Sequence, residues 1–257
     1  MNITLIQTHI YWQDVAANLA HFEEKIWQIK QKTDLIILPE MFTTGFSMDA
    51  KNLAEVPNLT TFKWLKQMAT QTDACVMGSY MVKENDEYFN RLIAMLPDGT
   101  FYQYDKRHLF RMANEHQNYT FGTKKIIFEW KNWKICPQIC YDLRFPVWSR
   151  NVDCEYDLLV YVANWPQARK QAWNVLLPAR AVENWCYVAA VNRIGEDGKG
   201  LQYSGNSQIA DFKGETIWHQ DNGEAIFSYD LDKKELQEYR QKFPAYLDAD
   251  IFELKIK

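Results

Sequence analysis

The chain has 257 residues and a net charge of -4, and it is 47% hydrophobic and 15% aromatic, so it can bury a sizeable core. Because charges of the two signs are mixed, without a long block of either, we expect no nucleic-acid partner and no polybasic membrane anchor. The first residues, MNITLIQTHI, lack the basic start and long apolar stretch of a signal peptide, and the apolar runs are too short to span a membrane.

Strands and amphipathic helices alternate in the first half of the chain. Strands are predicted for three apolar runs, NITLIQ (2–7), DLIILPE (34–40) and ACVMGSYMV (74–82). A helix capped by Asp14 should separate the first two strands, and a helix around residues 62–69 should separate the next two. The stretch 92–106 then predicts a hairpin that turns at residues 97–99.

The second half of the chain repeats this alternation. Strands are predicted for three further runs, KICPQICYD (134–142), DLLVYVAN (157–164) and CYVAAVN (186–192). A helix is expected over residues 170–185, where Pro178 should kink the helix or restart it. A second hairpin is expected at residues 207–219, and Asp232 with Glu235 forms the capping box of a last helix.

The two halves share one order of elements, which is helix, strand, helix, strand and hairpin. Two such halves, each with a sheet covered by helices on one face, can bury their other sheet faces against each other. We therefore expect an α/β protein with a four-layer α-β-β-α sandwich of two similar halves, whose strand ends meet at one edge. Since no low-complexity tract or Ser/Gly-rich linker divides the chain, residues 1–257 are predicted to form one domain.

Reactive side chains stand where three of the predicted strands end. Glu40 closes one strand, Lys106 closes the first hairpin, and Cys140 ends a third strand that changes at once into a polar loop. A thiol at such a corner, with charges nearby, favours reactivity over simple packing. An acid can accept and return the thiol proton, while an ammonium and the backbone N–H of Tyr141 can stabilise an oxyanion. This set suits acyl transfer through a covalent intermediate.

Each of these residues also has an ordinary structural interpretation. A glutamate after a proline and a lysine at a strand end are commonly solvated, so their coincidence matters only if the strands are neighbours. A zinc site made of Cys136, Cys140, His108 and His116 is another alternative, but the C-x-x-x-C spacing on a strand is poor for tetrahedral coordination. We therefore expect no metal and interpret Cys136 as a core residue. The five cysteines, an odd number, predict reduced thiols and a cytoplasmic location.

Three short motifs carry a family resemblance. They are LPEMF (38–42), YDKRHLF (104–110) and CYDLRFP (140–146). In this order they resemble the three signatures of the nitrilase superfamily of carbon–nitrogen hydrolases. The similarity extends to three further stretches, NWP (164–166), ARAVENWCYVAAVNR (179–193) and SGNSQIADFKGE (204–215). It therefore covers nearly the whole chain, and three linked motifs are far more specific than any one of them.

The resemblance implies a fold and a catalytic set. The family fold is an α-β-β-α sandwich that usually dimerises through helices, so we expect a homodimer. The implied triad is Glu40 as the general base, Lys106, and Cys140 as the nucleophile, without a cofactor. The family often has a second glutamate after the lysine motif, and RMANEHQ offers Glu115 for that place. Its implied role is to orient Lys106 or to assist the proton transfers.

Within the family, KRHLFRMANEH is most similar to bacterial omega-amidases, which hydrolyse the side-chain amide of 2-oxo acid monoamides. Such an enzyme must hold the carboxylate of its small substrate, and arginine matches a carboxylate with two parallel hydrogen bonds. The candidates are Arg111, Arg169 and Arg144. We favour Arg111, and we expect Arg144 to form an ion pair with Asp142 instead. Trp165, which follows a strand as Glu40 does in the other half, is a candidate for the pocket wall.

Two alternatives stay open. Another amidase or a nitrilase would use the same fold and triad on a different substrate. A catalytically idle binding protein would keep only the fold, although the intact set of Glu40, Lys106 and Cys140 argues against it. Release of ammonia from a panel of amides and nitriles would distinguish these functions.

Overall fold

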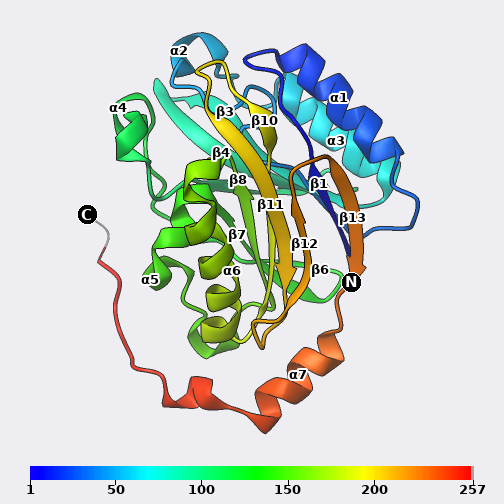
Figure 1. Cartoon of the computed structure of the whole chain (residues 1–257), viewed down its shortest axis with the longest axis vertical. Helices are drawn as coiled ribbons and strands as arrows, with labels where there is room; N and C mark the ends of the chain where they lie inside the picture. Colours follow the sequence, from blue (N-terminus) through cyan, green and yellow to red (C-terminus); the bar gives the residue numbers. More distant parts are fainter. Residues whose placement is uncertain (256–257) are drawn as a thin grey trace.

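Two β-sheets stacked face to face form the centre of the molecule (Figure 1). The computed structural model describes residues 1–255. The six-stranded sheet has the order β13 (Ala225–Asp230), β1 (Asn2–Gln7), β2 (Leu35–Ile37), β3 (Cys75–Glu84), β4 (Glu87–Met95) and β5 (Phe101–Asp105). The seven-stranded sheet has the order β12 (Thr216–Asp221), β11 (Gln202–Ala210), β9 (Tyr187–Asn192), β8 (Leu158–Ala163), β7 (Trp133–Ile139) and β6 (Phe128–Trp130), and β10 (Ile194–Glu196) also pairs with β11.

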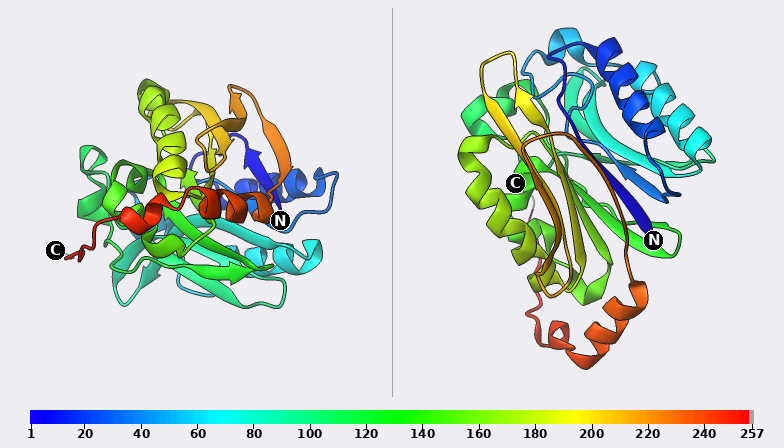
Figure 2. Two further views of the ribbon diagram at one scale, coloured as in Figure 1. Left: turned by 90° about the horizontal axis from the view of Figure 1, so that it is seen from below. Right: turned by 45° about the vertical axis from the view of Figure 1, so that its right-hand side comes forward.

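Helices cover the outer face of each sheet (Figure 2). The first sheet carries α1 (Val15–Trp27) and α3 (Thr60–Thr72), and the second carries α5 (Pro146–Ser149) and α6 (Lys170–Asn184). The predicted four-layer sandwich is therefore confirmed. The remaining helices lie at the ends of the sandwich and are α2 (Ala50–Leu53), α4 (Glu115–Asn118) and α7 (Lys233–Lys242). None of the helices in residues 1–255 combines the length and the apolar character that crossing a membrane requires.

The predicted repeat is visible in the strand directions. Strands β1, β2 and β3 run parallel in the first sheet, as β7, β8 and β9 do in the second. On one side of these three parallel strands each sheet is extended by antiparallel strands, which are β4 and β5 in the first sheet and β11 and β12 in the second. Both predicted hairpins are confirmed. The sequence did not predict β13, which comes from the C-terminal part of the chain yet pairs with β1 in the first sheet.

The two predicted helix caps are present, although one of them differs in detail. Asp14 accepts a hydrogen bond from the backbone N–H of Ala17 at 3.0 Å, and Asp232 accepts one from Glu235 at 3.0 Å. The carboxylate of Glu235 lies 3.1 Å from the ammonium of Lys213. It therefore pairs with the hairpin instead of closing the expected capping box.

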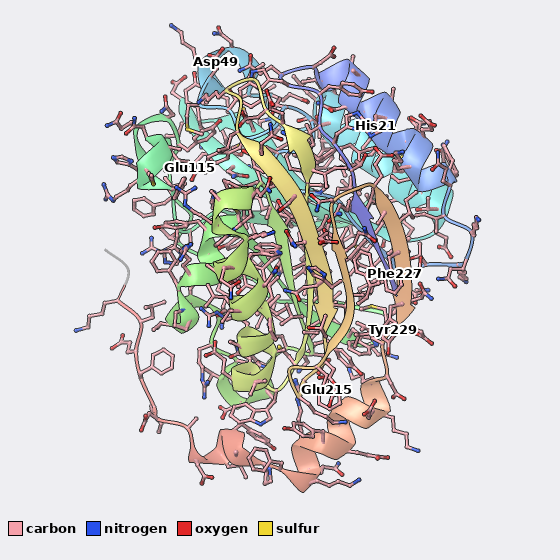
Figure 3. The ribbon with its side chains drawn as sticks, in the orientation of Figure 1. His21, Asp49, Glu115, Glu215, Phe227 and Tyr229 are labelled. Carbon is pink, nitrogen blue, oxygen red and sulfur yellow. The ribbon has the colours of Figure 1, made fainter. Side chains whose placement is uncertain are left out.

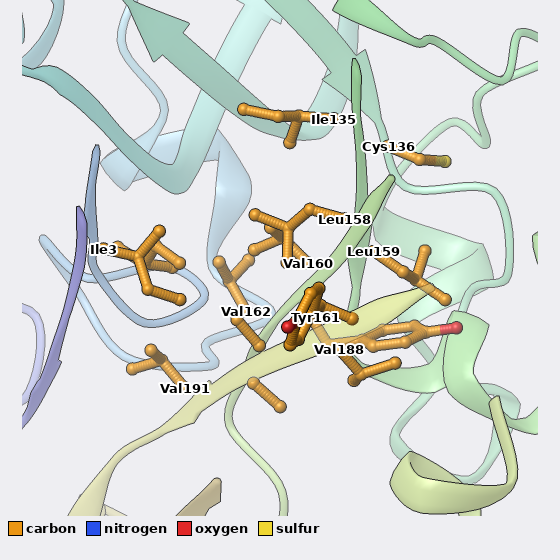
Figure 4. Packing of buried hydrophobic residues seen from close by; sticks show 14 of the residues in the cluster. Ile3, Ile135, Cys136, Leu158, Leu159, Val160, Tyr161, Val162, Val188 and Val191 are labelled. Carbon is orange, nitrogen blue, oxygen red and sulfur yellow. The ribbon is translucent and has the colours of Figure 1, made fainter. Parts of the chain in front are cut away.

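The core between the sheets explains why the parallel strands are so apolar. Every residue of β8 is buried. Figure 4 shows Val160 and Val162 on the side of Ile3, and Leu159 with Cys136 on the opposite side. A strand covered on both faces needs apolar residues at every position, so its sequence does not alternate between apolar and polar residues. The interpretation of Cys136 as a core residue is confirmed, since its side chain is fully buried.

Pro178 does not restart its helix, so this alternative of the prediction is wrong. Helix α6 runs continuously from Lys170 to Asn184. A proline removes one intrahelical hydrogen bond and disfavours the preceding turn. In α6, however, Trp173, Leu177 and Ala181 are fully buried at four-residue spacing against the second sheet. This packing stabilises the helix through the proline.

Candidate active site

Glu40 and Lys106 meet just beyond the ends of two strands of the first sheet. Strand β2 ends at Ile37 and β5 ends at Asp105, so both residues lie in the loops that follow. The ammonium nitrogen of Lys106 lies 2.8 Å from Glu40 Oε1, and both side chains are buried. Because a buried charge is stable only when it is paired, this contact fixes the two loops relative to each other.

Glu115, labelled in Figure 3, lies at the start of α4 and also contacts Lys106. Its two carboxylate oxygens lie 2.9 and 3.0 Å from Lys106 Nζ. The backbone N–H of Phe110 donates to Glu115 Oε2 at 2.5 Å, which anchors the carboxylate. The ring centre of Phe46 lies 4.9 Å from the ammonium. Two carboxylates and one aromatic face therefore hold the lysine.

Two asparagines that the sequence analysis did not single out orient Glu40. Asn90, in the middle of β4, donates from Nδ2 to Glu40 Oε1 at 2.8 Å. The backbone N–H of Asn164 donates to Glu40 Oε2 at 2.8 Å, and its Nδ2 donates to the Glu40 carbonyl. Asn164 is the first residue of the NWP stretch (164–166), and the family resemblance of this stretch could have identified it as a site residue. Asn90 is a polar residue in a largely buried strand, and no motif in the neighbouring sequence identifies it as a site residue.

Cys140 stands at a sharp corner of the backbone. Strand β7 ends at Ile139, and a 3₁₀-helix spans Cys140–Arg144. The φ angle of Cys140 is 45°, in the left-handed region that residues other than glycine rarely adopt. Because Tyr141 follows at the start of this helix, its backbone N–H has no acceptor within the helix. The thiol and a free N–H group therefore emerge at the same corner.

Burial and charge set the protonation states at this corner. Burial raises the pKa of the Cys140 thiol well above its usual range, Glu40 raises it further, and Lys106 opposes the shift. Burial acts to lower the pKa of Lys106, but Glu115 and Glu40 outweigh it and raise that pKa. Burial also raises the pKa of Glu115, although Lys106 opposes this. The resting cysteine is therefore a neutral thiol beside a charged lysine, and it needs a base to become a nucleophile.

Asp142 links the corner after β7 to the loop after β5. Its Oδ2 accepts hydrogen bonds from the hydroxyl of Tyr104 at 2.6 Å and the backbone N–H of Ile139 at 3.0 Å. Its Oδ1 accepts from the backbone N–H of His108 at 2.9 Å and lies 2.7 Å from His108 Nδ1. The carboxylate is fully buried. It therefore holds together the two loops that carry the thiol and the ammonium.

The ion pair expected between Asp142 and Arg144 is wrong. The Asp142 carboxylate has four partners within the protein, so its acceptor positions are filled. The guanidinium of Arg144 lies instead over the ring of Trp165, 5.0 Å from the ring centre. The 3₁₀-helix has three residues per turn, so residues two positions apart project from different sides of it, and residue spacing alone did not reveal that Asp142 and Arg144 share this helix.

A cavity of about 100 Å³ opens in front of the thiol. The sequence-predicted residues Lys106, Cys140, Tyr141, Trp165 and Arg169 all line it. Its other lining residues come from loops of both halves of the chain and are Phe46, Phe110, Ala113, Arg144, Asn164, Pro166, Asp197, Lys199, Leu201 and Tyr203. The cavity is small, partly aromatic and richer in cations than in anions.

The preference for Arg111 as a residue of this cavity is wrong. Arg111 is exposed on a 3₁₀-helix, Arg111–Ala113, and lines a separate surface hollow with Arg107 and His116. The two other candidates do line the cavity. Arg144 lies over Trp165, and Arg169 lies 5.2 Å from the ring centre of Phe110. Arg111 and Ala113 belong to the same 3₁₀-helix, but of these two residues only Ala113 lines the cavity, and a motif position could not reveal this difference.

The four residues of the zinc alternative do not converge. Cys136 lies in the core next to Leu159 (Figure 4), and among residues 1–255 it does not belong to a group of converging metal ligands. His108 Nδ1 is bonded to Asp142, and its ring stacks on Phe145 with centres 3.8 Å apart.

Comparisons with known proteins agree with this architecture. The family model described as carbon–nitrogen hydrolase matches residues 2–241. The omega-amidase YafV of Yersinia enterocolitica is 48% identical to the chain, over 98% of this chain and 98% of the relative. The 2-oxoglutaramate amidase of Bacillus subtilis is 31% identical, with 96% of each chain covered.

Solved structures show the same fold. XC1258 from Xanthomonas campestris, described as a CN-hydrolase superfamily protein with an arsenic adduct in the active site, superposes with a TM-score of 0.97 at 43% identity, covering 99% of both chains. Nit3 of Saccharomyces cerevisiae, described as a member of branch 10 of the nitrilase superfamily, gives a TM-score of 0.86 at 25% identity, covering 95% of this chain and 94% of Nit3. The chain belongs to the carbon–nitrogen hydrolase family, within the nitrilase superfamily.

Proposed function

We propose that the protein is an omega-amidase, which hydrolyses the terminal amide of small dicarboxylic acid monoamides such as 2-oxoglutaramate. The products are the free acid, here 2-oxoglutarate, and ammonia. Relatives that carry the names omega-amidase and 2-oxoglutaramate amidase cover nearly the whole chain. The chemistry of the cavity supports the same substrate class independently of these names.

In the first half-reaction, Cys140 attacks the amide carbon and forms a tetrahedral intermediate. Glu40 takes the thiol proton during the attack and then gives it to the departing nitrogen. The C–N bond breaks, ammonia leaves, and the acyl group remains on sulfur as a thioester. The raised pKa of the thiol makes such a base necessary, because little thiolate exists before substrate binds.

Lys106 and the N–H of Tyr141 stabilise the oxyanion of each tetrahedral intermediate. An ammonium has three hydrogens, and Lys106 contacts one oxygen of Glu40 and both oxygens of Glu115. One of the two contacts with Glu115 can pass to the oxyanion while the other keeps the lysine in place. Glu115 therefore acts as the residue that orients Lys106.

In the second half-reaction, water attacks the thioester. Glu40 accepts a proton from the water and returns one to the departing sulfur, so the acid is released and the thiol is restored. The hydrogen bonds of Asn90 and Asn164 to Glu40 keep its carboxylate directed at the reaction centre throughout.

The observation that carries the substrate assignment is the pair of arginines in the cavity. Arg144 and Arg169 contact aromatic faces, and within residues 1–255 no carboxylate forms an ion pair with either of them. Within residues 1–255 the only hydrogen bond that either guanidinium donates runs from Arg169 Nη2 to Met112 Sδ, a weak acceptor, at 3.0 Å, so the other donors remain for a ligand. A substrate carboxylate would supply the acceptor, with the two parallel bonds that guanidinium favours.

The test compares arginine variants on two substrates of equal length, 2-oxoglutaramate and a neutral amide, by ammonia release. Arg144→Ala or Arg169→Ala should lose about 2–3 kcal/mol, or roughly 30- to 150-fold in kcat/KM, on the acidic substrate alone. Arg111→Ala is the matched control, because Arg111 lies outside the cavity, and it should keep wild-type selectivity. Equal losses on both substrates would contradict the proposed carboxylate site.

The same panel separates the alternatives. Turnover of the neutral amide or of a nitrile in preference to the monoamide would identify another amidase or a nitrilase. No ammonia from any compound would favour a catalytically idle binding protein.

We further propose that residues 1–257 work as one catalytic domain in a cytoplasmic homodimer. Five free cysteines fit a reducing compartment, and dimerisation through helices is usual for the family. Light scattering of the purified chain tests the dimer, and a monomer of full activity would contradict it. Fractionation of cells tests the location.

A further inference from the structure

Three potential metal ligands converge far from the cavity. His9 follows β1, His21 lies on α1, and Glu224 lies between β12 and β13. Figure 3 shows His21 on the outer helix of the first sheet, well separated from Glu115 of the candidate active site. The cluster therefore joins two residues near the start of the chain to Glu224, which lies 215 residues after His9, and it has no part in the proposed amide chemistry.

The separations between the ligand atoms suit one metal ion. One ligand atom from each residue lies within 4.8 Å of the other two. His9 Nδ1 lies 3.0 Å from Glu224 Oε1, and His21 Nε2 lies 3.8 Å from the same oxygen. Tetrahedral zinc with bonds of about 2.1 Å needs ligand atoms about 3.4 Å apart. The two distances lie on either side of this value, so small side-chain shifts suffice.

Neighbouring groups already hold His21 and Glu224 in place. Thr8 Oγ1 lies 2.7 Å from His21 Nε2 and donates to Glu224 Oε1 at 2.5 Å. The ammonium of Lys25 lies 2.6 Å from the other oxygen, Glu224 Oε2, and leaves Oε1 toward the histidines. The rings of His9 and His21 lie 4.3 Å apart between centres. The Lys25 contact is an outer contact of the kind that orients the ligands of metal sites, whereas the Thr8 hydroxyl contacts the two ligand atoms themselves and would turn away as the ion binds.

We propose that His9, His21 and Glu224 bind a divalent transition-metal ion, for which zinc is the best match. Two imidazoles and one carboxylate suit zinc, whereas magnesium and calcium prefer oxygen ligands alone. His21 would present the lone pair of Nε2 and keep its proton on Nδ1, and water would fill the fourth position. The ion would fasten the β12–β13 turn to α1 and so secure β13, the strand that completes the first sheet.

The experiment measures zinc binding by titration calorimetry with zinc chloride on the folded Cys140→Ala protein, which removes the thiol of the cavity as a competing ligand. One zinc ion per chain is expected, with a rise in Tm on binding. His21→Gln and Glu224→Gln should each weaken binding at least tenfold. His219→Gln is the matched control, because it also removes one histidine but lies outside the cluster, bonded to Asn206. It should bind zinc as the parent does.

Two further measurements keep the proposal testable if a variant folds poorly. Cobalt bound to the parent protein should give the visible absorption of a tetrahedral site. Chelation of the zinc-loaded wild-type protein should lower its Tm and leave its amidase activity unchanged. No saturable zinc binding by the folded parent, or equal affinity in His21→Gln, would overturn the proposal and leave a cluster held by hydrogen bonds alone. Loss of activity on chelation would also overturn it, since the ion would then act in the cavity.

Discussion

Replacing Asp142 by asparagine should damage both stability and catalysis. The substitution keeps the shape of the side chain but removes its charge and two of its acceptor positions. If the new Oδ1 still faces His108, the new amide NH₂ faces the hydroxyl of Tyr104 and the N–H of Ile139. Two donors then face donors in a fully buried site.

The magnitude follows from these contacts. The backbone N–H of Ile139 cannot turn away, and a buried donor without an acceptor costs about 1–3 kcal/mol. The hydroxyl of Tyr104 already accepts from the indole N–H of Trp148 at 2.9 Å, so it cannot readily accept from the new amide as well. Adding the weaker bonds to His108, we expect a loss of about 3–5 kcal/mol in the free energy of unfolding, the range for breaking a buried charged contact.

Urea unfolding and ammonia release form the assay. Asp153→Asn is the control, because Asp153 is exposed, and it should change the free energy of unfolding by less than about 0.5 kcal/mol. Since Asp142 joins the loops that carry Cys140 and Lys106, kcat should also fall by about 10²-fold, as expected for a small misplacement of reacting groups. A loss of less than about 1 kcal/mol together with wild-type kcat would refute the reasoning.

Three further outcomes are expected. Cys140→Ala should fold normally and lose essentially all turnover, and mass spectrometry of wild type quenched during turnover should find the acyl group on Cys140; an adduct on Cys136 would refute the assignment. Lys106→Met should lower kcat by about 10²–10³ while changing KM much less, because an oxyanion donor acts in the transition state, and near-wild-type turnover would contradict this. Burial raises the pKa of the Cys136 thiol to about 12. The unfolded thiol ionises at about pH 8.5, so this thiol's contribution to stability is complete below that pH and is lost as pH rises toward the folded pKa, by about 1.4 kcal/mol per unit. Between pH 8 and 10, the free energy of unfolding measured in urea should therefore fall by about 2 kcal/mol less for Cys136→Ala than for the reduced wild type. Equal decreases in both proteins would contradict this prediction.

Local chemistry was enough to predict much of the molecule. Continuous apolar runs indicated the parallel strands, and Asp14 and Asp232 indicated two helix starts, because these signals act within a few residues. The coincidence of Glu40, Lys106 and Cys140 at strand ends needed only the order of the elements. Matched halves place equivalent strand ends at one edge, and there the structure brings the three side chains together.

Contacts between distant segments were decided only by the tertiary structure. Asn90 orients Glu40 from the middle of a strand, and nothing in its own sequence neighbourhood distinguishes it from a core residue. Arg144 and Arg169 line the cavity while Arg111 does not, because the direction of a side chain depends on where the backbone turns in three dimensions. Helix α6 continues through Pro178 because it buries apolar side chains against the second sheet. Sequence by itself determined the elements and the reactive residue types, and packing between segments far apart in the chain determined which polar groups those residues meet.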